Sequence, residues 1–349
     1  MTFSFKCLLK LCAVSLFTII GLFGLSTCSS STKPTLYIFT WSDLFKPELI
    51  KQFENEFNCT VAIDTFDSNE SMYAKLKLSS VNYDLIMPSN YYVSILQNQN
   101  MIQQINPRKI PNARNYDSRY FKFTPDVAAL PYIVTFSGIA YRTDRVKIED
   151  PSWGVFSRND LKGRMTMLND CREALGAALK YRGHSINSRQ KEVVESAGEL
   201  LLSWKKNLAK FESEQYKNGL SNGEFLLVQG YSIDITQVVA ETPEVSFVYP
   251  KEGAIMSIDC MAIPTNAKNV QLAHDFINFM IEPLAALENM KFTNSLIPIR
   301  IAYEMLDNTS RDNPLLFPPE EDFERMELIE DLQGDIQIYY KVWDRVKSG

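Results

Sequence analysis

The stretch TLYIFTWSDLFKP, residues 35–47, decides the fold class of this chain. Residues 36–39 are apolar and β-prone, which is the composition of a strand buried on both faces. Residues 41–43 place an aromatic ring, a hydroxyl and a carboxylate on a turn, and a helical pattern of apolar residues begins after Pro47. A strand, a polar turn and a helix in this order form the unit in which ligands bind at the carboxyl end of an open α/β sheet.

The turn itself has two interpretations. A flat ring, Trp41, beside a carboxylate, Asp43, suits a bound cation, because ring face and carboxylate both attract positive charge. The same residues are also typical of a surface loop whose tryptophan packs locally and whose aspartate is solvated. The rest of the chain has to decide between the two.

The residues that follow continue the same alternation. Residues 60–63 are a second predicted strand, 69–79 a helix and 83–87 a third strand, after which Ser89 is a predicted helix N-cap. This βαβαβ order predicts a parallel sheet and a doubly wound α/β fold. Two later extended segments are predicted to cross between domains, and further helices follow (crossings 128–141 and 255–263; helices 174–181, 192–206 and 269–290; a tail helix within 318–349 with Ile336, Tyr339, Tyr340 and Trp343 on its apolar side).

The composition and net charge of the chain limit the classes of ligand and partner that it is expected to bind. The chain has 349 residues, enough for two domains, and its 45% hydrophobic and 22% charged residues are ordinary for a globular protein. The net charge of −6 becomes −8 when Lys6 and Lys10 of the leader are left out. A negative chain is disfavoured as a nucleic-acid binder, and it is compatible with a cationic ligand.

The first 28 residues have the pattern of an export signal. Two lysines precede an uncharged segment, residues 11–25, which is shorter than the roughly 20 residues needed to span a bilayer. Small residues before Cys28 predict a bacterial lipoprotein signal peptide over 1–27, with Cys28 as the lipid-carrying first mature residue. The alternative is a cleaved signal that leaves a soluble exported protein.

Carboxylates recur just past the ends of predicted strands. A single one is usually a helix N-cap, but five at comparable positions of two α/β regions favour a shared cleft. Carboxylates that face each other repel until a cation arrives, which favours an open ligand-free state and ligand-driven closure. We therefore expect a cleft lined with rings and without protein positive charge, around Asp43, Asp170, Glu173, Asp234 and Asp259.

Catalytic and metal-binding patterns are missing from the sequence. The chain has only two histidines, and it contains no G-x-S-x-G, G-x-x-x-x-G-K or H-E-x-x-H motif, so we expect neither an enzyme nor a metal or cofactor. Ser188 and Ser203 each precede a lysine by three residues, but no K-T-G motif accompanies them. The Tyr91-Tyr92 pair leaves a ferric-iron site as an alternative.

Six motifs, in order along the chain, carry a family resemblance. The chain resembles the bacterial spermidine/putrescine-binding receptors of ABC transporters over nearly all of its mature length. The motifs are W-S-D (41–43), S-N-E-S-M-Y-A-K-L-K (68–77), Y-D-L-I-M-P-S-N-Y-Y-V (83–93), N-D-C-R-E (169–173), Y-P-K-E-G (249–253) and D-C-M-A-I-P-T-N-A-K-N (259–269).

The resemblance implies an α/β, two-domain periplasmic binding protein of type II, each lobe a mixed sheet flanked by helices, with the ligand cleft between the lobes. The N-terminal lobe would comprise residues 33–137 and 258–303, and the C-terminal lobe residues 138–257 and 304–349. The implied partners are spermidine or putrescine, the permease subunits of an importer and, through Cys28, a membrane. A periplasmic monomer without a cofactor is expected.

The resemblance also implies the site. Its aromatic residues would stack on the methylene chain, its serines would be polar neighbours, and its acidic residues would accept hydrogen bonds from ammonium groups. The implied ligand-binding residues are Trp41, Ser42, Asp43, Ser89, Tyr91, Asp170, Glu173, Tyr231, Asp234 and Asp259.

The chain also departs from the family. Leu44, Ser257 and Ser295 stand at positions that are aromatic in the spermidine receptor, Tyr231 replaces a tryptophan, and Ile329 falls where a glutamine contacts an amine. Each lost ring removes roughly 0.5–2 kcal/mol of cation–π contact, which leaves the choice between diamine and triamine open.

Several alternatives stay open. The neighbours of Asp170 and Asp259, Cys171 and Cys260, could form a disulfide that locks the lobes or remain two buried thiols. A receptor of this fold for another small cation, and a degenerate receptor kept as a sensor or surface anchor, are the rival functions. A hydrolase is disfavoured because no nucleophile and base are paired.

Overall fold

The computed structural model describes residues 33–78, 82–121 and 127–349. The predicted signal peptide 1–27 and lipidation at Cys28 lie outside these residues. Among the described helices, none has both the length and the apolar character that a membrane crossing needs. The segment from Thr35 to Gly349 forms one compact body, and the following description concerns this body alone.

One mixed sheet runs through this body, and in the described residues its main order is β2-β1-β3-β10-β5-β8-β6-β7. Strands β4 and β11 add to β10, and β9 adds to β5. The strands are β1 (Thr35–Thr40), β2 (Thr60–Thr65), β3 (Leu85–Ile86), β4 (Ile102–Gln103), β5 (Ala129–Arg142), β6 (Met165–Met167), β7 (Leu208–Phe211), β8 (Leu227–Tyr231), β9 (Val245–Val248), β10 (Ile255–Pro264) and β11 (Glu327–Leu328).

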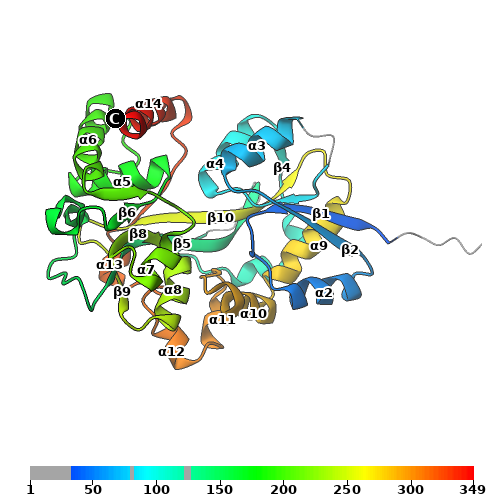
Figure 1. Cartoon of the computed structure of the whole chain (residues 1–349). Coiled ribbons are helices and arrows are strands. Elements are labelled where there is room, and N and C mark those ends of the chain that lie inside the picture. Colours follow the sequence, from blue (N-terminus) through cyan, green and yellow to red (C-terminus); the bar gives the residue numbers. More distant parts are fainter. Residues whose placement is uncertain (1–32, 79–81, 122–126) are drawn as a thin grey trace, which may run out of the picture. The chain divides into compact units, whose positions relative to one another are not determined.

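Helices flank the sheet, as Figure 1 shows. They are α2 (Pro47–Glu56), α3 (Asn69–Leu78), α4 (Asn90–Asn98), α5 (Cys171–Tyr181), α6 (Lys191–Lys205), α7 (Tyr216–Asn222), α8 (Ser232–Glu241), α9 (Val270–Met280), α10 (Pro283–Thr293), α11 (Arg300–Glu304), α12 (Asn308–Arg311), α13 (Glu320–Phe323) and α14 (Ile336–Ser348).

The first unit of the chain folds as its pattern predicts. Strand β1 pairs in parallel with both β2 and β3, so the βαβαβ order is confirmed. The side chains of Leu36, Ile38 and Phe39 are buried, which explains the continuous apolar run. As a result, the turn after β1 and the start of α4 lie at the same edge of the sheet.

Strands β5 and β10 are the longest and run antiparallel side by side (Figure 1). Both predicted crossing segments are therefore continuous strands. The hydrophobic core divides along β5: residues up to Phe136 pack in one cluster, whereas Ile139 and Ala140 belong to two others. The exact lobe boundaries given above stay a prediction.

One helix prediction was wrong. The apolar pattern of residues 269–290 belongs to two helices, α9 and α10, which are separated by Ile281 and Glu282. Proline lacks an N–H and is tolerated in the first turn of a helix, so α10 begins at Pro283. The carboxylate of Glu282 caps this new helix by accepting hydrogen bonds from the N–H groups of Leu284 and Ala285.

Candidate functional site

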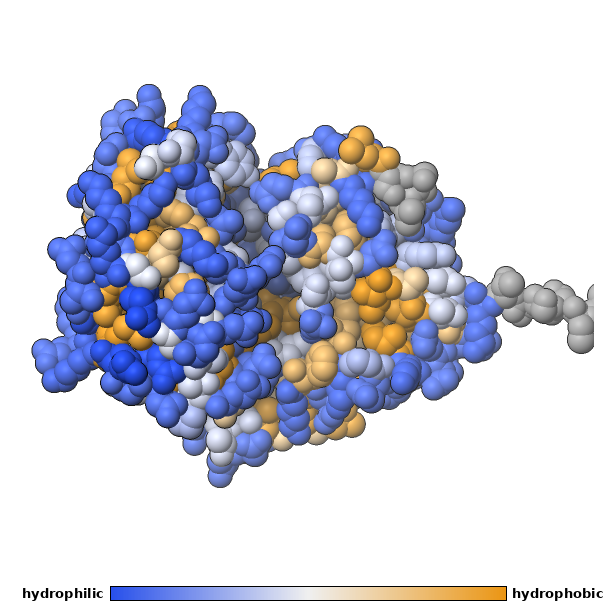
Figure 2. Space-filling model, in the orientation of Figure 1, coloured by the Kyte–Doolittle hydropathy of each residue, from blue (hydrophilic) through white to orange (hydrophobic). Residues whose placement is uncertain are grey.

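A cavity of about 1200 Å³ lies where several of the predicted residues meet. Figure 2 shows a hollow on this face of the molecule, between α5, α6 and α14 on one side and α3 and α4 on the other. The cavity is lined by Phe39, Trp41, Ser42, Thr65, Phe66, Asp67, Ser68, Asn69, Glu70, Ser71, Lys75, Tyr91, Asn169, Asp170, Cys171, Arg172, Ser213, Glu214, Lys217, Tyr231, Asp234, Ile336, Tyr340 and Trp343.

The predicted site residues fall into three groups in relation to this cavity. Asp43 does not line it: its side chain is exposed and its φ is 55°, on the turn after β1. Ser89, Glu173 and Asp259 are also absent from the lining and lie in the wall behind it. The others line the cavity directly: Trp41, Ser42, Tyr91, Asp170, Tyr231 and Asp234.

Asp170 combines a structural role with a place in the cavity. It is the N-cap of α5 and accepts hydrogen bonds from the N–H groups of Arg172 (2.7 Å) and Glu173 (3.0 Å). Both bonds reach Oδ1, so the helix cap does not use Oδ2. Burial raises the pKa of Asp170, although the two backbone bonds act against this.

Glu173, one turn into the same helix, is almost fully buried. Its hydrogen-bond partner is the hydroxyl of Ser137 on β5, which donates to Oε2 at 2.5 Å. Burial and the charge of Asp170 raise the pKa of Glu173 to about 8, and the Ser137 bond only partly offsets them. At neutral pH this carboxyl group therefore holds a proton for much of the time.

Asp259 belongs to a network that fixes the opposite wall. The hydroxyl of Ser89 donates to Asp259 Oδ1 at 2.8 Å, although Ser89 stands at the N-cap position of α4. Asn69 Nδ2 in turn donates to Ser89 Oγ (3.0 Å) and to the Tyr91 hydroxyl (3.2 Å). Burial raises the pKa of Asp259 to about 6, against the lowering effect of Ser89 and Trp41.

The rings of the cavity come from both ends of the chain. Trp41 packs edge-on against Phe66 with ring centroids 4.5 Å apart, and Tyr91 packs against Tyr92 at 5.2 Å. Tyr340 and Trp343 of α14 also line the cavity, and sequence reasoning placed them only on the apolar side of a tail helix. The residues that this helix buries in the core are Tyr339, which was predicted on the apolar side, together with Val342 and Val346.

The expectation of a cleft without protein cations was wrong. Lys75, Arg172 and Lys217 line the cavity, but each has its own partners. Lys75 pairs with Asp64 at 3.2 Å, and Lys217 pairs with Asp234 at 3.0 Å. The Arg172 guanidinium donates to the Glu330 and Ile186 carbonyls and to Asn187 Oδ1, and it lies over the ring of Tyr339.

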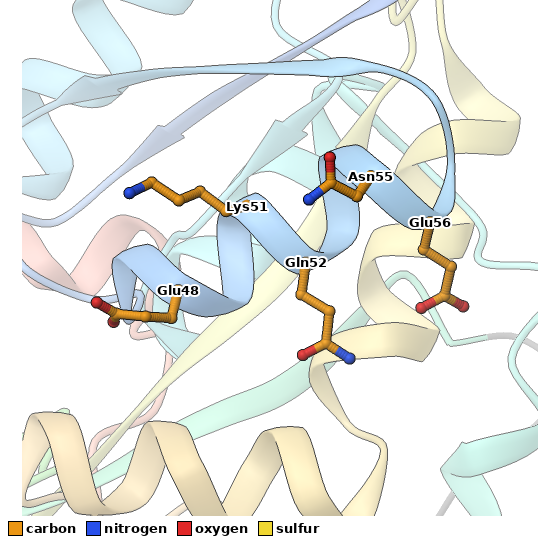
Figure 3. Close-up of a pocket in the computed structure, with 5 residues that line it drawn as sticks. All are labelled: Glu48, Lys51, Gln52, Asn55 and Glu56. Carbon is orange, nitrogen blue, oxygen red and sulfur yellow. The ribbon is translucent and has the colours of Figure 1, made fainter.

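Three other features of the described residues give no indication of a second binding site, a disulfide or a metal site. A second hollow, of about 630 Å³, is lined by five polar side chains, and Figure 3 shows that all five come from one helix, α2. Cys171 and Cys260 are both thiols, so within the described part of the chain the disulfide alternative is not realised. No cluster of histidine, cysteine and acidic side chains suited to a metal occurs among the described residues.

The comparisons with known proteins identify relatives of this chain. Residues 48–318 match the family of bacterial extracellular solute-binding proteins. A spermidine/putrescine-binding periplasmic protein of Salmonella typhimurium is 32% identical over 336 residues, which cover 93% of this chain and 95% of that protein.

Two solved structures extend the likeness to the fold. The TpPotD lipoprotein of Treponema pallidum is 31% identical with a TM-score of 0.81, covering 89% of this chain and 99% of that one. The spermidine/putrescine ABC transporter substrate-binding protein PotD of Streptococcus pneumoniae is 25% identical with a TM-score of 0.81, covering 90% and 99%. The predicted fold class, a two-lobed α/β periplasmic binding protein, is confirmed by this agreement.

Proposed function

Because the chain belongs to the bacterial extracellular solute-binding proteins, we propose that it is the receptor of a polyamine importer, which binds spermidine, putrescine or both in the cavity. Relatives named for these ligands cover nearly the whole chain, which supports the ligand class. The chemistry of the cavity supports it independently.

The observation that carries the proposal is a set of carboxyl groups that form no ion pair with a described protein cation. Within residues 33–78, 82–121 and 127–349, no lysine or arginine forms an ion pair with Asp170, Glu173 or Asp259. Burying an anion is unfavourable unless a cation and hydrogen bonds offset the lost hydration. Ammonium groups of a ligand supply both.

The rings supply the second half of the recognition. A polyamine alternates ammonium groups with short methylene chains. These chains are apolar and, when extended, can pack along the face of an aromatic ring. Trp41, Tyr91 and Tyr231 line the cavity and would cover the methylene chain, with Ser42 as a polar neighbour. Cation–π contact adds about 0.5–2 kcal/mol for each ammonium group near a ring face.

The site residues in the wall behind the cavity would act on the ligand without contacting it. Asp259 would attract the ammonium groups through its charge, and Ser89 would orient it. Glu173 would do the same once a nearby ammonium group has lowered its pKa and its proton has left. Asp43, exposed on the turn after β1, would contribute only to the negative field at the entrance.

The same proposal covers the partners. The receptor would deliver its ligand to the permease subunits of an ABC importer and would catalyse no reaction. It would act as a monomer in the periplasmic space, held to the membrane by lipid on Cys28.

The test is a calorimetric titration of the chain from residue 29 onward with spermidine, putrescine and cadaverine. The expected result is saturable one-site binding of at least one of them, weakened by added salt because the contacts are charged. Hexane-1,6-diol, which keeps a methylene chain but has no charge, is the control and should give no heat. Absence of heat and of any thermal shift with all three amines would reject the ligand class.

A further inference from the structure

One carboxylate in the cavity differs from the others because it already holds an ammonium group. Asp234 lies in the first turn of α8, and Lys217 Nζ lies 3.0 Å from its Oδ1. The hydroxyl of Tyr216 donates to Oδ2 at 2.6 Å. Both oxygens of Asp234 are therefore engaged by residues of α7.

The position of this pair makes it relevant to the ligand. Lys217 and Asp234 both line the cavity, and Tyr231, three residues before Asp234, lines it as well. The same Tyr216 hydroxyl also accepts a hydrogen bond from the backbone N–H of Tyr231, at 3.1 Å. A ligand that stacks on Tyr231 thus extends towards a carboxylate that a lysine occupies.

Chemically, a lysine side chain is an ammonium group on four methylenes, which is the end of a polyamine attached to the protein. A ligand ammonium that approaches Asp234 has to displace Lys217 or meet a like charge beside it. Asp170, by contrast, has no lysine or arginine ion-pair partner among the described residues, so it can bind a ligand ammonium without displacing a protein cation.

On the basis of the proposed function, we infer that Lys217 is a specificity-determining residue, whose ammonium group occupies Asp234 in place of a ligand ammonium. The pair consequently lowers the affinity of the cavity for a polyamine whose third ammonium group reaches Asp234 more than it lowers the affinity for a diamine. Replacing Lys217 by an uncharged side chain of similar length opens Asp234 to a third ammonium, and Tyr216 continues to hold the carboxylate in place.

The experiment compares putrescine and spermidine binding to the wild-type chain and to Lys217→Met by calorimetry. The expected result is a gain in spermidine affinity of about tenfold, the size of one hydrogen bond to a charged group, with a gain of less than about threefold for putrescine. Lys217→Arg keeps the charge and should keep the wild-type ratio of affinities.

The matched control is Lys210→Met. Lys210 pairs with Glu212 at 2.9 Å, and it does not line the cavity, so its loss changes the net charge equally without opening a carboxylate in the cavity. The double variant Lys217→Met/Asp234→Asn should lose the gain. Binding of both amines with the same affinity ratio in wild type and Lys217→Met overturns the inference, whereas binding of neither amine by either protein rejects the proposed function itself.

Discussion

Two buried carboxyl groups in this molecule, Asp84 and Glu173, are surrounded in opposite ways. Asp84, directly before β3, is fully buried and accepts hydrogen bonds from four N–H groups: the backbone N–H of Tyr37, Lys268 and Asn269, and the Asn269 amide, at 2.7–3.1 Å. Glu173 is buried to nearly the same degree, but among the residues that the structure describes only the Ser137 hydroxyl bonds to its side chain.

The difference separates a carboxylate that holds the fold together from one that, under the proposed function, serves a ligand. Four N–H donors replace the hydration that Asp84 loses on folding, and they tie together three segments that are distant in the sequence. Glu173 receives far less compensation, so its charge is unfavourable in the ligand-free protein. Burial alone therefore does not distinguish a structural carboxylate from a candidate binding carboxylate. The number of hydrogen-bond donors around the carboxylate distinguishes them.

The largest expected effect is on stability, at Asp84. The Asp84→Ala variant leaves four N–H groups without their acceptor at a fully buried position, and we expect a loss of about 3–4 kcal/mol in the free energy of unfolding. Urea denaturation followed by circular dichroism measures it. The control Asp160→Asn removes an exposed carboxylate that pairs with Arg158, and it should change stability by less than about 1 kcal/mol. Equal losses in both variants would contradict the role given to Asp84.

Next in size is the effect on ligand affinity at Asp170. Asparagine caps helices as well as aspartate does, so Asp170→Asn should keep the stability of the protein and remove only the charge. We expect spermidine affinity to fall about thirtyfold, corresponding to one lost hydrogen bond between charged groups. Asp43→Asn, on the exposed turn, should change it by less than about twofold. A larger loss of affinity at Asp43 than at Asp170 would contradict a binding site at Asp170 and would place it at the exposed turn after β1.

The smallest expected effect on affinity is at Glu173, where affinity and stability should change in opposite directions. Glu173→Gln should weaken spermidine binding about tenfold. Its stability should exceed that of the wild type at pH 9, because the raised pKa of about 8 makes ionised Glu173 unfavourable in the folded state. The gain should shrink as the pH falls towards the unfolded value of about 4.3, where wild-type Glu173 is neutral as well.

Glu212 is the matched control for the direction of this stability change, because its pKa is shifted the opposite way. Burial would raise its pKa, but the backbone N–H groups of Gln215 and Glu214 together with Lys210 lower it to about 2. Glu212→Gln should therefore destabilise the protein at neutral pH, and the loss should shrink as the pH falls from about 4.3 towards 2. Denaturant titrations of the two variants at several pH values check both signs, and two variants with the same sign would contradict the comparison.

Much of the fold could be predicted from local patterns. The apolar run of β1, the polar turn after it and the alternation of strands and helices were sufficient for the parallel unit, since each depends on near neighbours. The break between α9 and α10 was missed because the apolar period continues across it, although Pro283 was the signal that should have ended the first helix.

The site was predictable to a lesser degree. Motifs and the family resemblance pointed to Trp41, Tyr91, Asp170 and Tyr231, and these four side chains line one cavity. The partner that Lys217 provides for Asp234, 17 residues away, depends on how α7 packs against α8, and no local pattern encodes that. Tyr340 fits the apolar pattern of the tail helix, so the sequence predicts it to pack in the core. The orientation of α14 in the fold places its side chain in the lining of the cavity instead.

The measurement that tests the central claim most directly is proton release on ligand binding. Calorimetric titrations with spermidine at pH 7, in buffers of different ionisation enthalpy, give the number of protons exchanged. An ammonium group near Glu173 lowers its pKa from about 8, so the account predicts a net release of about one proton or less per ligand, and an affinity that rises from pH 6 to pH 8. Binding without proton release, and with the same affinity at pH 6 and pH 8, would contradict it.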